Sequence, residues 1–110
     1  MNANRRYERV GLFRQLTLTI LADGQTVPAH SFDASLGGVG LTAAVFLSRG
    51  EPVQVAFHLS DRDGQPVVEC VAGMVAFCRP EQEGNIMGIE FLAPVQLDTQ
   101  PELTRILQNL

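Results

Sequence analysis

The sequence contains no lysine and no tryptophan, and only two cysteines and one tyrosine occur among its 110 residues. Two cysteines cannot supply a disulfide framework or a four-ligand zinc site. The N-terminal segment carries positive charge but no apolar stretch, so it is not predicted to be a signal peptide. No run reaches about 18 uninterrupted apolar residues, so no membrane-spanning helix is predicted. These absences favour a cytoplasmic protein with reduced thiols.

Length and charge further limit the class of protein to which this chain can belong. A chain of 110 residues is expected to form one domain and to bury a core without covalent cross-links. Only 18% of the residues are charged, and the net charge is −4. An acidic chain is not expected to bind DNA or RNA in general, because that requires a positive field. Half of the eight basic residues nevertheless lie near the N-terminus, at Arg5, Arg6, Arg9 and Arg14.

Alternation of apolar and polar residues predicts β-strands over most of the chain. The expected strands cover residues 12–21, 27–32, 39–44, 53–59, 66–78 and 86–92. Turn residues separate them at 23–24, 33–38, 49–52, 61–66 and 80–85. Six short antiparallel strands with short turns predict a mainly β fold, a small closed barrel.

The apolar period changes in residues 99–110. Four residues here have the i, i+3, i+4, i+7 spacing of an amphipathic helix: Leu103, Ile106, Leu107 and Leu110. Thr99 and Glu102 have the spacing of a capping box, with Pro101 in the first turn. We expect this helix to pack on the barrel.

The predicted strand 66–78 is apolar on both faces. One face should meet the core, and we expect the C-terminal helix to cover the other. Cys70 and Cys78 both have even numbers in this strand, so they are predicted to share a face. Free cysteines are most often buried, and both are therefore predicted to be buried, reduced thiols.

Two segments break the strand pattern. They read Arg5-Arg6-Tyr7-Glu8-Arg9 and Asp33-Ala34-Ser35-Leu36-Gly37-Gly38. Together they resemble the RxxxR and [D/N]xSxxG motifs of the PilZ domain family, and the similarity extends over about residues 5–92. The matching positions are Arg5, Arg9, Asp33, Ser35 and Gly38. The resemblance implies a six-stranded barrel that binds the bacterial second messenger cyclic di-GMP, with a flexible arm at 1–11, the barrel at 12–92 and the helix at 99–110.

Arginines suit that ligand, which carries two phosphates and two guanines. A guanidinium can grip a phosphate, stack on a base, or donate to guanine O6 and N7. Arg5, Arg6 and Arg9 are therefore predicted ligand residues. Asn4, before the first motif arginine, leaves open whether one or two ligand molecules bind. The alternative for these arginines is a solvated terminal tail.

The second motif supplies complementary groups. Asp33 can accept from the guanine N1–H and amino group, and Ser35 offers a hydroxyl donor. Gly37 and Gly38 allow close approach of the backbone to a ligand. Phe77 matches a position where relatives often carry an aromatic residue that can stack on guanine. The structural alternatives are turn formation by Asp33 and Ser35, a bend at the glycines, and a core position for Phe77.

Three functions from different classes remain. The first is a receptor without catalytic activity, in which cyclic di-GMP orders the arm over the barrel and an unidentified protein reads the new surface. The second is a PilZ-like protein interaction module that does not bind nucleotide. The third is a small hydrolase using His30, Asp33 and Ser35, which are crowded together without a G-x-S-x-G pattern. No metal site and no cofactor beyond the ligand are predicted.

Overall fold

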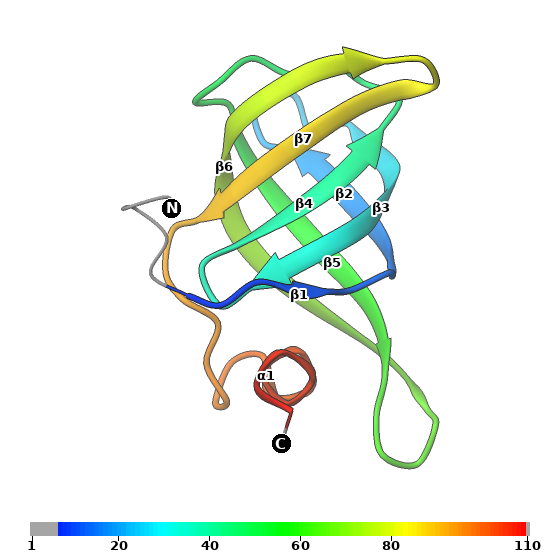
Figure 1. The fold of residues 1–110 in the computed structure, drawn as a ribbon, viewed down its shortest axis with the longest axis vertical. Helices are drawn as coiled ribbons and strands as arrows, with labels where there is room; N and C mark the ends of the chain where they lie inside the picture. Colours follow the sequence, from blue (N-terminus) through cyan, green and yellow to red (C-terminus); the bar gives the residue numbers. More distant parts are fainter. Residues whose placement is uncertain (1–6, 110) are drawn as a thin grey trace.

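The computed structural model describes residues 7–109 and is mainly β, with one helix at the C-terminal end (Figure 1). The elements are β1 (Val10–Gly11), β2 (Gln15–Ile20), β3 (Thr26–Ser35), β4 (Gly38–Ala43), β5 (Pro52–Ser60), β6 (Pro66–Glu81), β7 (Gly84–Phe91) and α1 (Pro101–Gln108). The six longer strands pair antiparallel in the order β3-β2-β5-β6-β7-β4, and β4 pairs back with β3. The predicted six-stranded antiparallel barrel with a C-terminal helix is confirmed.

The barrel interior is filled by the apolar side chains that alternation predicts. In β5, Val53, Val55 and Phe57 are fully buried, whereas Gln54 and His58 between and beside them are exposed. This arrangement follows from the period of two residues along a strand, which sends neighbouring side chains to opposite faces. The same alternation buries Leu16, Leu18 and Ile20 of β2.

The predicted strand 12–21 is shorter in the structure, because β2 begins only at Gln15, and the separate strand β1 precedes it. The two-residue strand β1 pairs with the end of β3, and Gly11 lies opposite Asp33. The Ser31 hydroxyl then spans the break, because it donates to the carbonyl of Leu12 at 2.6 Å and accepts from the Arg14 N–H at 2.9 Å. β1 therefore brings the N-terminal chain to the edge of β3.

A β-bulge in β3 changes which residues face the core. Ser31 is opposite Leu41 and Asp33 is opposite Gly40, so Phe32 is the extra residue. Before the bulge the odd-numbered position Ser31 is buried, and after it the even-numbered Ala34 is buried. Bulges re-aim side chains in this way. As a result Asp33 lies on the outer wall of the barrel.

A second bulge in β6 has the same effect. Val75 is opposite Ile89 and Phe77 is opposite Gly88, which leaves Ala76 as the extra residue. Phe77 is therefore 46% exposed. The prediction of a shared buried face for the two cysteines was wrong. The bulge lies between them and changes whether odd- or even-numbered residues of β6 face the core.

The cysteines accordingly lie in different surroundings. Cys70 is exposed, whereas Cys78 is half-buried and packs against the core. Neither forms a disulfide bond, so the two thiols are free. The prediction that both thiols are buried is corrected by this arrangement.

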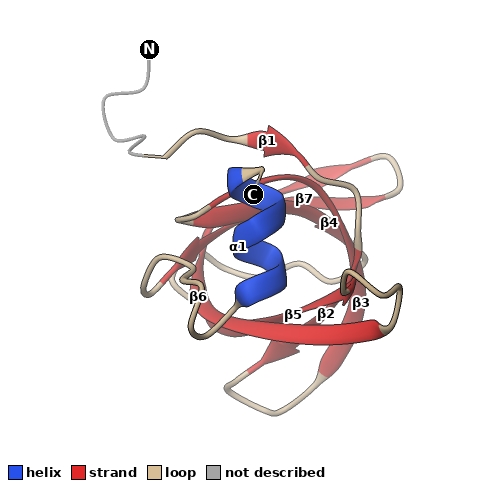
Figure 2. Cartoon of the chain, turned by 90° about the horizontal axis from the view of Figure 1, so that it is seen from below, coloured by secondary structure: helices blue, strands red, loops and turns tan. Residues whose placement is uncertain are grey.

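Helix α1 lies across one open end of the barrel (Figure 2). Leu103 is fully buried there, and Ile106 and Leu107 pack against the core. Leu110, the fourth residue of the predicted apolar stripe, lies outside the described residues. The expectation that the helix covers the outer face of β6 was wrong.

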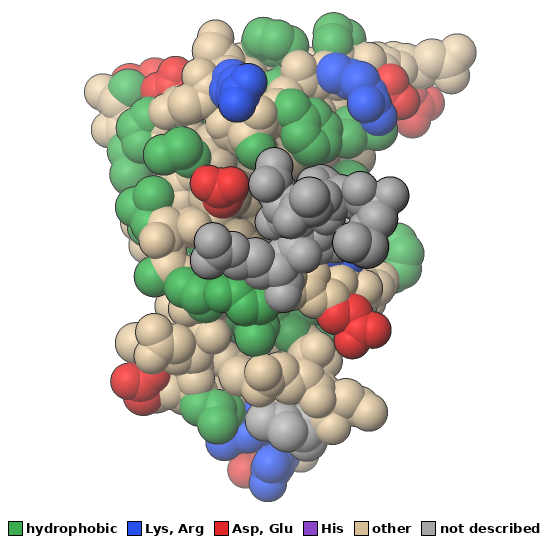
Figure 3. Space-filling view, turned by 60° about the vertical axis from the view of Figure 1, so that its left-hand side comes forward, with side chains coloured by type: hydrophobic (Ala, Val, Ile, Leu, Met, Phe, Trp, Pro, Cys, Tyr) green, Lys and Arg blue, Asp and Glu red, His purple; other side chains and the backbone are tan. Residues whose placement is uncertain are grey.

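The outer face of β6 is exposed to solvent along its length. Val68 is 54% exposed and Met74 is 39% exposed. Figure 3 turns the left-hand side of Figure 1 forward and shows hydrophobic side chains on the surface, with charged side chains between them. Apolar residues on both faces of a strand therefore do not require a covering element.

The N-terminus of α1 is capped from a distant strand. The backbone N–H groups of Glu102 and Leu103 donate to the two carboxylate oxygens of Glu69 on β6, at 2.9 and 2.8 Å. Gln100 is the N-cap residue and makes no side-chain cap bond, so the predicted capping box at Thr99 is not formed. A carboxylate at this end satisfies unpaired N–H groups and complements the helix dipole.

Removal of the Glu69 cap should destabilise the protein. Glu69 is only 6% exposed, and its loss leaves two N–H groups at a packed helix end without their partners. We expect Glu69→Ala to lower the free energy of unfolding by about 2 kcal/mol in urea titrations. Glu83→Ala, in the exposed β6–β7 turn, is the matched control. Equal stability of the two variants would contradict the capping role.

Candidate functional site

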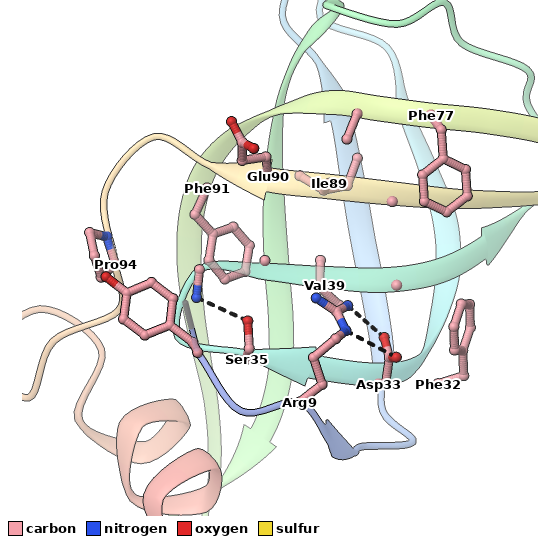
Figure 4. A pocket seen from close by; sticks show the side chains of 16 residues that line it. Arg9, Phe32, Asp33, Ser35, Val39, Phe77, Ile89, Glu90, Phe91 and Pro94 are labelled. Carbon is pink, nitrogen blue, oxygen red and sulfur yellow. Dashed lines mark hydrogen bonds and ion pairs between the residues drawn. The ribbon is translucent and has the colours of Figure 1, made fainter. Parts of the chain in front are cut away.

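A pocket of about 880 Å³ opens on the outer wall of the barrel, over β4 and β7 and between the ends of β3 and β6 (Figure 4). This volume lies within the range typical of small-molecule sites. Six of the eight predicted ligand residues line the pocket: Arg9, Asp33, Ser35, Gly37, Gly38 and Phe77. The other two, Arg5 and Arg6, lie outside the described residues.

An ion pair joins the two sequence motifs in this pocket. Arg9 Nη2 lies 2.7 Å from Asp33 Oδ1, and Arg9 Nε donates to Asp33 Oδ2 at 3.1 Å. Their side chains are 27% and 33% exposed. A two-point pair of this kind fixes the plane of the guanidinium. The Nη1 amino group of Arg9 is not used in this pair.

The second motif forms the end of a strand and a short turn. β3 continues to Ser35 and β4 begins at Gly38, so only residues 36 and 37 form the turn. The prediction of a turn over all of 33–38 was too long, because the bulge allows β3 to continue. Ser35 Oγ accepts from the Gly37 N–H at 3.1 Å, which stabilises this turn.

Glycines form the floor of the pocket. Gly40 and Gly88 lie opposite each other in the β4–β7 pair. A Cβ at Gly40 would lie 2.5 Å from Asp33 Oδ1 and 2.7 Å from the Phe32 ring, and a Cβ at Gly88 would meet the Phe77 ring. The floor is thus bare backbone on which neighbouring side chains rest.

Gly37 and Gly38 have different surroundings. A Cβ at Gly38 would lie 2.6 Å from the backbone carbonyl oxygen of Ile89, so strand packing requires glycine there. A Cβ at Gly37 would lie 2.8 Å from Cδ2 of Tyr7, which is the far part of a side chain. Tyr7 therefore packs over the turn and brings the N-terminal chain to the pocket.

Sequence reasoning missed ten of the sixteen residues of the lining. Among these ten are Tyr7, Phe32, Gly40, Gly88 and Glu90. Glycines inside strands, which often mark a close approach of neighbouring groups, were the available signal for Gly40 and Gly88. No comparable signal identified Phe32, because its position depends on the bulge.

The charges of the described lining are unfavourable for an anion. The positive charge of Arg9 is balanced by Asp33, and Glu90 adds a negative charge on the exposed side of β7. A ligand with two phosphates needs further cations. Arg5 and Arg6 precede Arg9 by four and three residues in the sequence.

The hydrolase alternative receives no support from this geometry. The carboxylate of Asp33 binds Arg9, and Ser35 binds the turn. His30 is exposed on β3, and the lining of the pocket does not include it among the described residues. Within residues 7–109, no three His, Cys, Asp or Glu side chains are grouped so as to bind a metal. No helix in that range has the length and apolarity needed to cross a membrane.

Comparisons with solved structures give the same fold. The inhibitor of motility MotI/DgrA of Bacillus subtilis aligns with a TM-score of 0.72 at 16% identity, over 98% of this chain and 53% of that chain. This chain therefore spans about half the length of that protein. The PilZ domain of YcgR from Escherichia coli, solved with c-di-GMP, has a TM-score of 0.69 at 22% identity over 97% and 91% of the two chains. The PilZ domain of CeSA from a cellulose-synthesizing bacterium has a TM-score of 0.60 at 20% identity over 93% and 96%.

At the level of sequence, comparison with curated proteins gave no match. The family model described as PilZ domain matches residues 3–109, which is nearly the whole chain. This match includes both motifs, together with the barrel and the helix. The chain belongs to the PilZ domain family.

Proposed function

We propose that this protein binds cyclic di-GMP in the pocket described above and signals by closure of its N-terminal arm over the barrel. The closed arm creates a surface that a cytoplasmic partner protein recognises. The observation that carries this proposal is the Arg9–Asp33 ion pair, which joins both family motifs inside one pocket of suitable size.

Arg9 and Asp33 have complementary roles in the proposal. Asp33 occupies Nε and one position on Nη2, so it orients the guanidinium and leaves Nη1 to donate to a phosphate or to guanine O6 and N7. The Asp33 carboxylate can also accept from the guanine N1–H and amino group. Gly37 and Gly38 permit approach of the ligand to the backbone at the turn.

Arg5 and Arg6 supply the additional positive charge. Tyr7 lines the pocket, and consecutive Cα atoms are about 3.8 Å apart. The chain therefore allows both guanidinium groups to reach a ligand in the pocket. The phosphates of the ligand offer charge-assisted contacts to these arginines, and such contacts exist only when ligand is bound, so ligand binding favours closure.

Hydrogen exchange tests this mechanism. Saturating cyclic di-GMP should slow amide exchange in residues 5–10 and 33–38, whereas the buried strand β5 should change little. The reason is that the ligand contacts the arm and the β3–β4 turn, while β5 already buries its apolar face. If the arm exchanges equally with and without saturating ligand, closure is refuted even where calorimetry detects binding.

The second candidate is a protein interaction module that does not bind nucleotide. The exposed apolar face of β6 favours it, because exposed apolar surface often marks a protein contact. A surface of this kind is compatible with both functions. A titration with cyclic di-GMP distinguishes them, since only the receptor gives saturable binding.

A further inference from the structure

Two phenylalanine rings lie over the glycine floor from opposite sides. Phe32 extends from β3 and Phe77 from β6, and both point toward the β4–β7 pair in Figure 4. Phe32 rests on Gly40 and Phe77 on Gly88, and these two glycines are direct cross-strand neighbours. The rings therefore flank adjoining positions at one end of the pocket.

Neither ring packs in the interior of the barrel. Phe32 is the extra residue of one bulge, and Phe77 directly follows the other. Phe32 is half-buried, and Phe77 is 46% exposed. Both bulges thus place an aromatic side chain in the pocket at the expense of regular strand pairing. Bulges next to binding sites commonly have this re-aiming role.

A polar group lies beside this apolar surface. The Asp33 carboxylate and the Phe32 ring flank the same glycine, Gly40. Arg9 is fixed to that carboxylate. An aromatic face with a carboxylate and a guanidinium at its margin offers a purine a stacking surface and hydrogen-bond partners for its edge.

We infer that Phe32 contacts the ligand directly and that Phe32 and Phe77 together form the surface on which one guanine of cyclic di-GMP packs. This inference rests on the proposed function and adds Phe32 to the site. Stacking accepts any purine, so the two rings supply affinity and the adjacent polar groups supply the choice of base.

Calorimetry with matched variants tests the inference. Phe32→Leu retains apolar bulk but removes the aromatic face, and it should weaken cyclic di-GMP binding about 5- to 50-fold. Phe32→Tyr keeps the ring and should bind within about twofold of wild type. Phe46→Leu is the control, because Phe46 is 56% exposed and lies outside the pocket lining. It should bind as wild type does.

The outcomes separate this inference from the proposed function. Wild-type affinity in a folded Phe32→Leu variant would overturn the role of Phe32 while leaving the receptor function intact. Absence of binding by the wild type would overturn both. If Phe32→Leu does not fold, the wild type provides the test of the role of Phe32. The measurement is then the nuclear Overhauser effect between guanine H8 and the ring protons of Phe32. Its presence supports the inference and its absence at saturation refutes it.

Discussion

Replacing Arg9 by alanine should weaken cyclic di-GMP binding by roughly 10- to 100-fold, which corresponds to about 1.5–3 kcal/mol for a lost charge-assisted contact. The free energy of unfolding should change by less than about 1 kcal/mol, because the Arg9–Asp33 pair is about one-third exposed. Arg9→Lys should restore little affinity, since lysine cannot form the two-point pair that orients the guanidinium.

Calorimetry and urea unfolding measure these effects. Arg79→Ala is the matched control, because Arg79 is exposed, lies outside the pocket lining and has only a weak pair with Glu81 at 3.9 Å. Unchanged affinity in Arg9→Ala would remove Arg9 from the site.

A double-mutant cycle with Asp33 extends this prediction. If Asp33 acts partly by orienting Arg9, the loss from Asp33→Ala should be smaller in the Arg9→Ala background than in wild type. If Asp33 also reads guanine, Asp33→Ala should reduce the preference for cyclic di-GMP over cyclic di-AMP. Additive losses that are equal for both ligands would leave Asp33 with a structural role in β3 alone.

Replacing Gly38 by alanine should lower the stability of the protein. This effect should be larger than the effect of losing any direct contact between Gly38 and the ligand. The added Cβ would lie 2.6 Å from the Ile89 carbonyl oxygen, and backbone cannot move away without disturbing the β4–β7 pair. We expect the free energy of unfolding to fall by about 2 kcal/mol or more.

Gly37→Ala is the matched comparison for Gly38→Ala. Its Cβ meets the Tyr7 ring, which can rotate away, so stability should change little. Urea unfolding of both variants provides the measurement. A Gly38→Ala variant as stable as Gly37→Ala would show that the motif glycine is not required by strand packing.

Local alternation predicted the strands because burial in a barrel wall repeats every two residues. The residues of β5 from Val53 to Leu59 follow this period without interruption, and the structure buries the expected positions. The closed barrel follows from six such strands joined by short connections. These features depend on sequence neighbours, so they could be inferred without coordinates.

The outward position of Asp33 and Phe77 could not be inferred from alternation. The two-residue alternation of a strand would place both side chains on the core side of the barrel. The bulges at Phe32 and Ala76 reverse this orientation. A bulge is defined by its pairing with another strand, which a single local pattern does not specify. The motif resemblance identified Asp33, but it did not reveal the bulge that exposes it.

The helix shows the same limit on a larger scale. Spacing identified its apolar stripe, but not the surface against which the stripe packs. Thr99 and Glu102 have the local spacing of a capping box, yet Glu69, more than thirty residues earlier, supplies the cap. The Arg9–Asp33 pair also joins residues 24 positions apart. Such contacts depend on the assembled barrel.

Titration calorimetry of the wild-type chain with cyclic di-GMP, beside cyclic di-AMP and the Arg9→Ala variant, tests the central claim most directly. We predict saturable heat with cyclic di-GMP at one or two ligands per chain, weaker binding of cyclic di-AMP, and a loss of affinity in the variant. No heat from the wild type at ligand concentrations up to about 100 µM, where even a micromolar site would be filled, would contradict the assignment of this pocket as a cyclic di-GMP site.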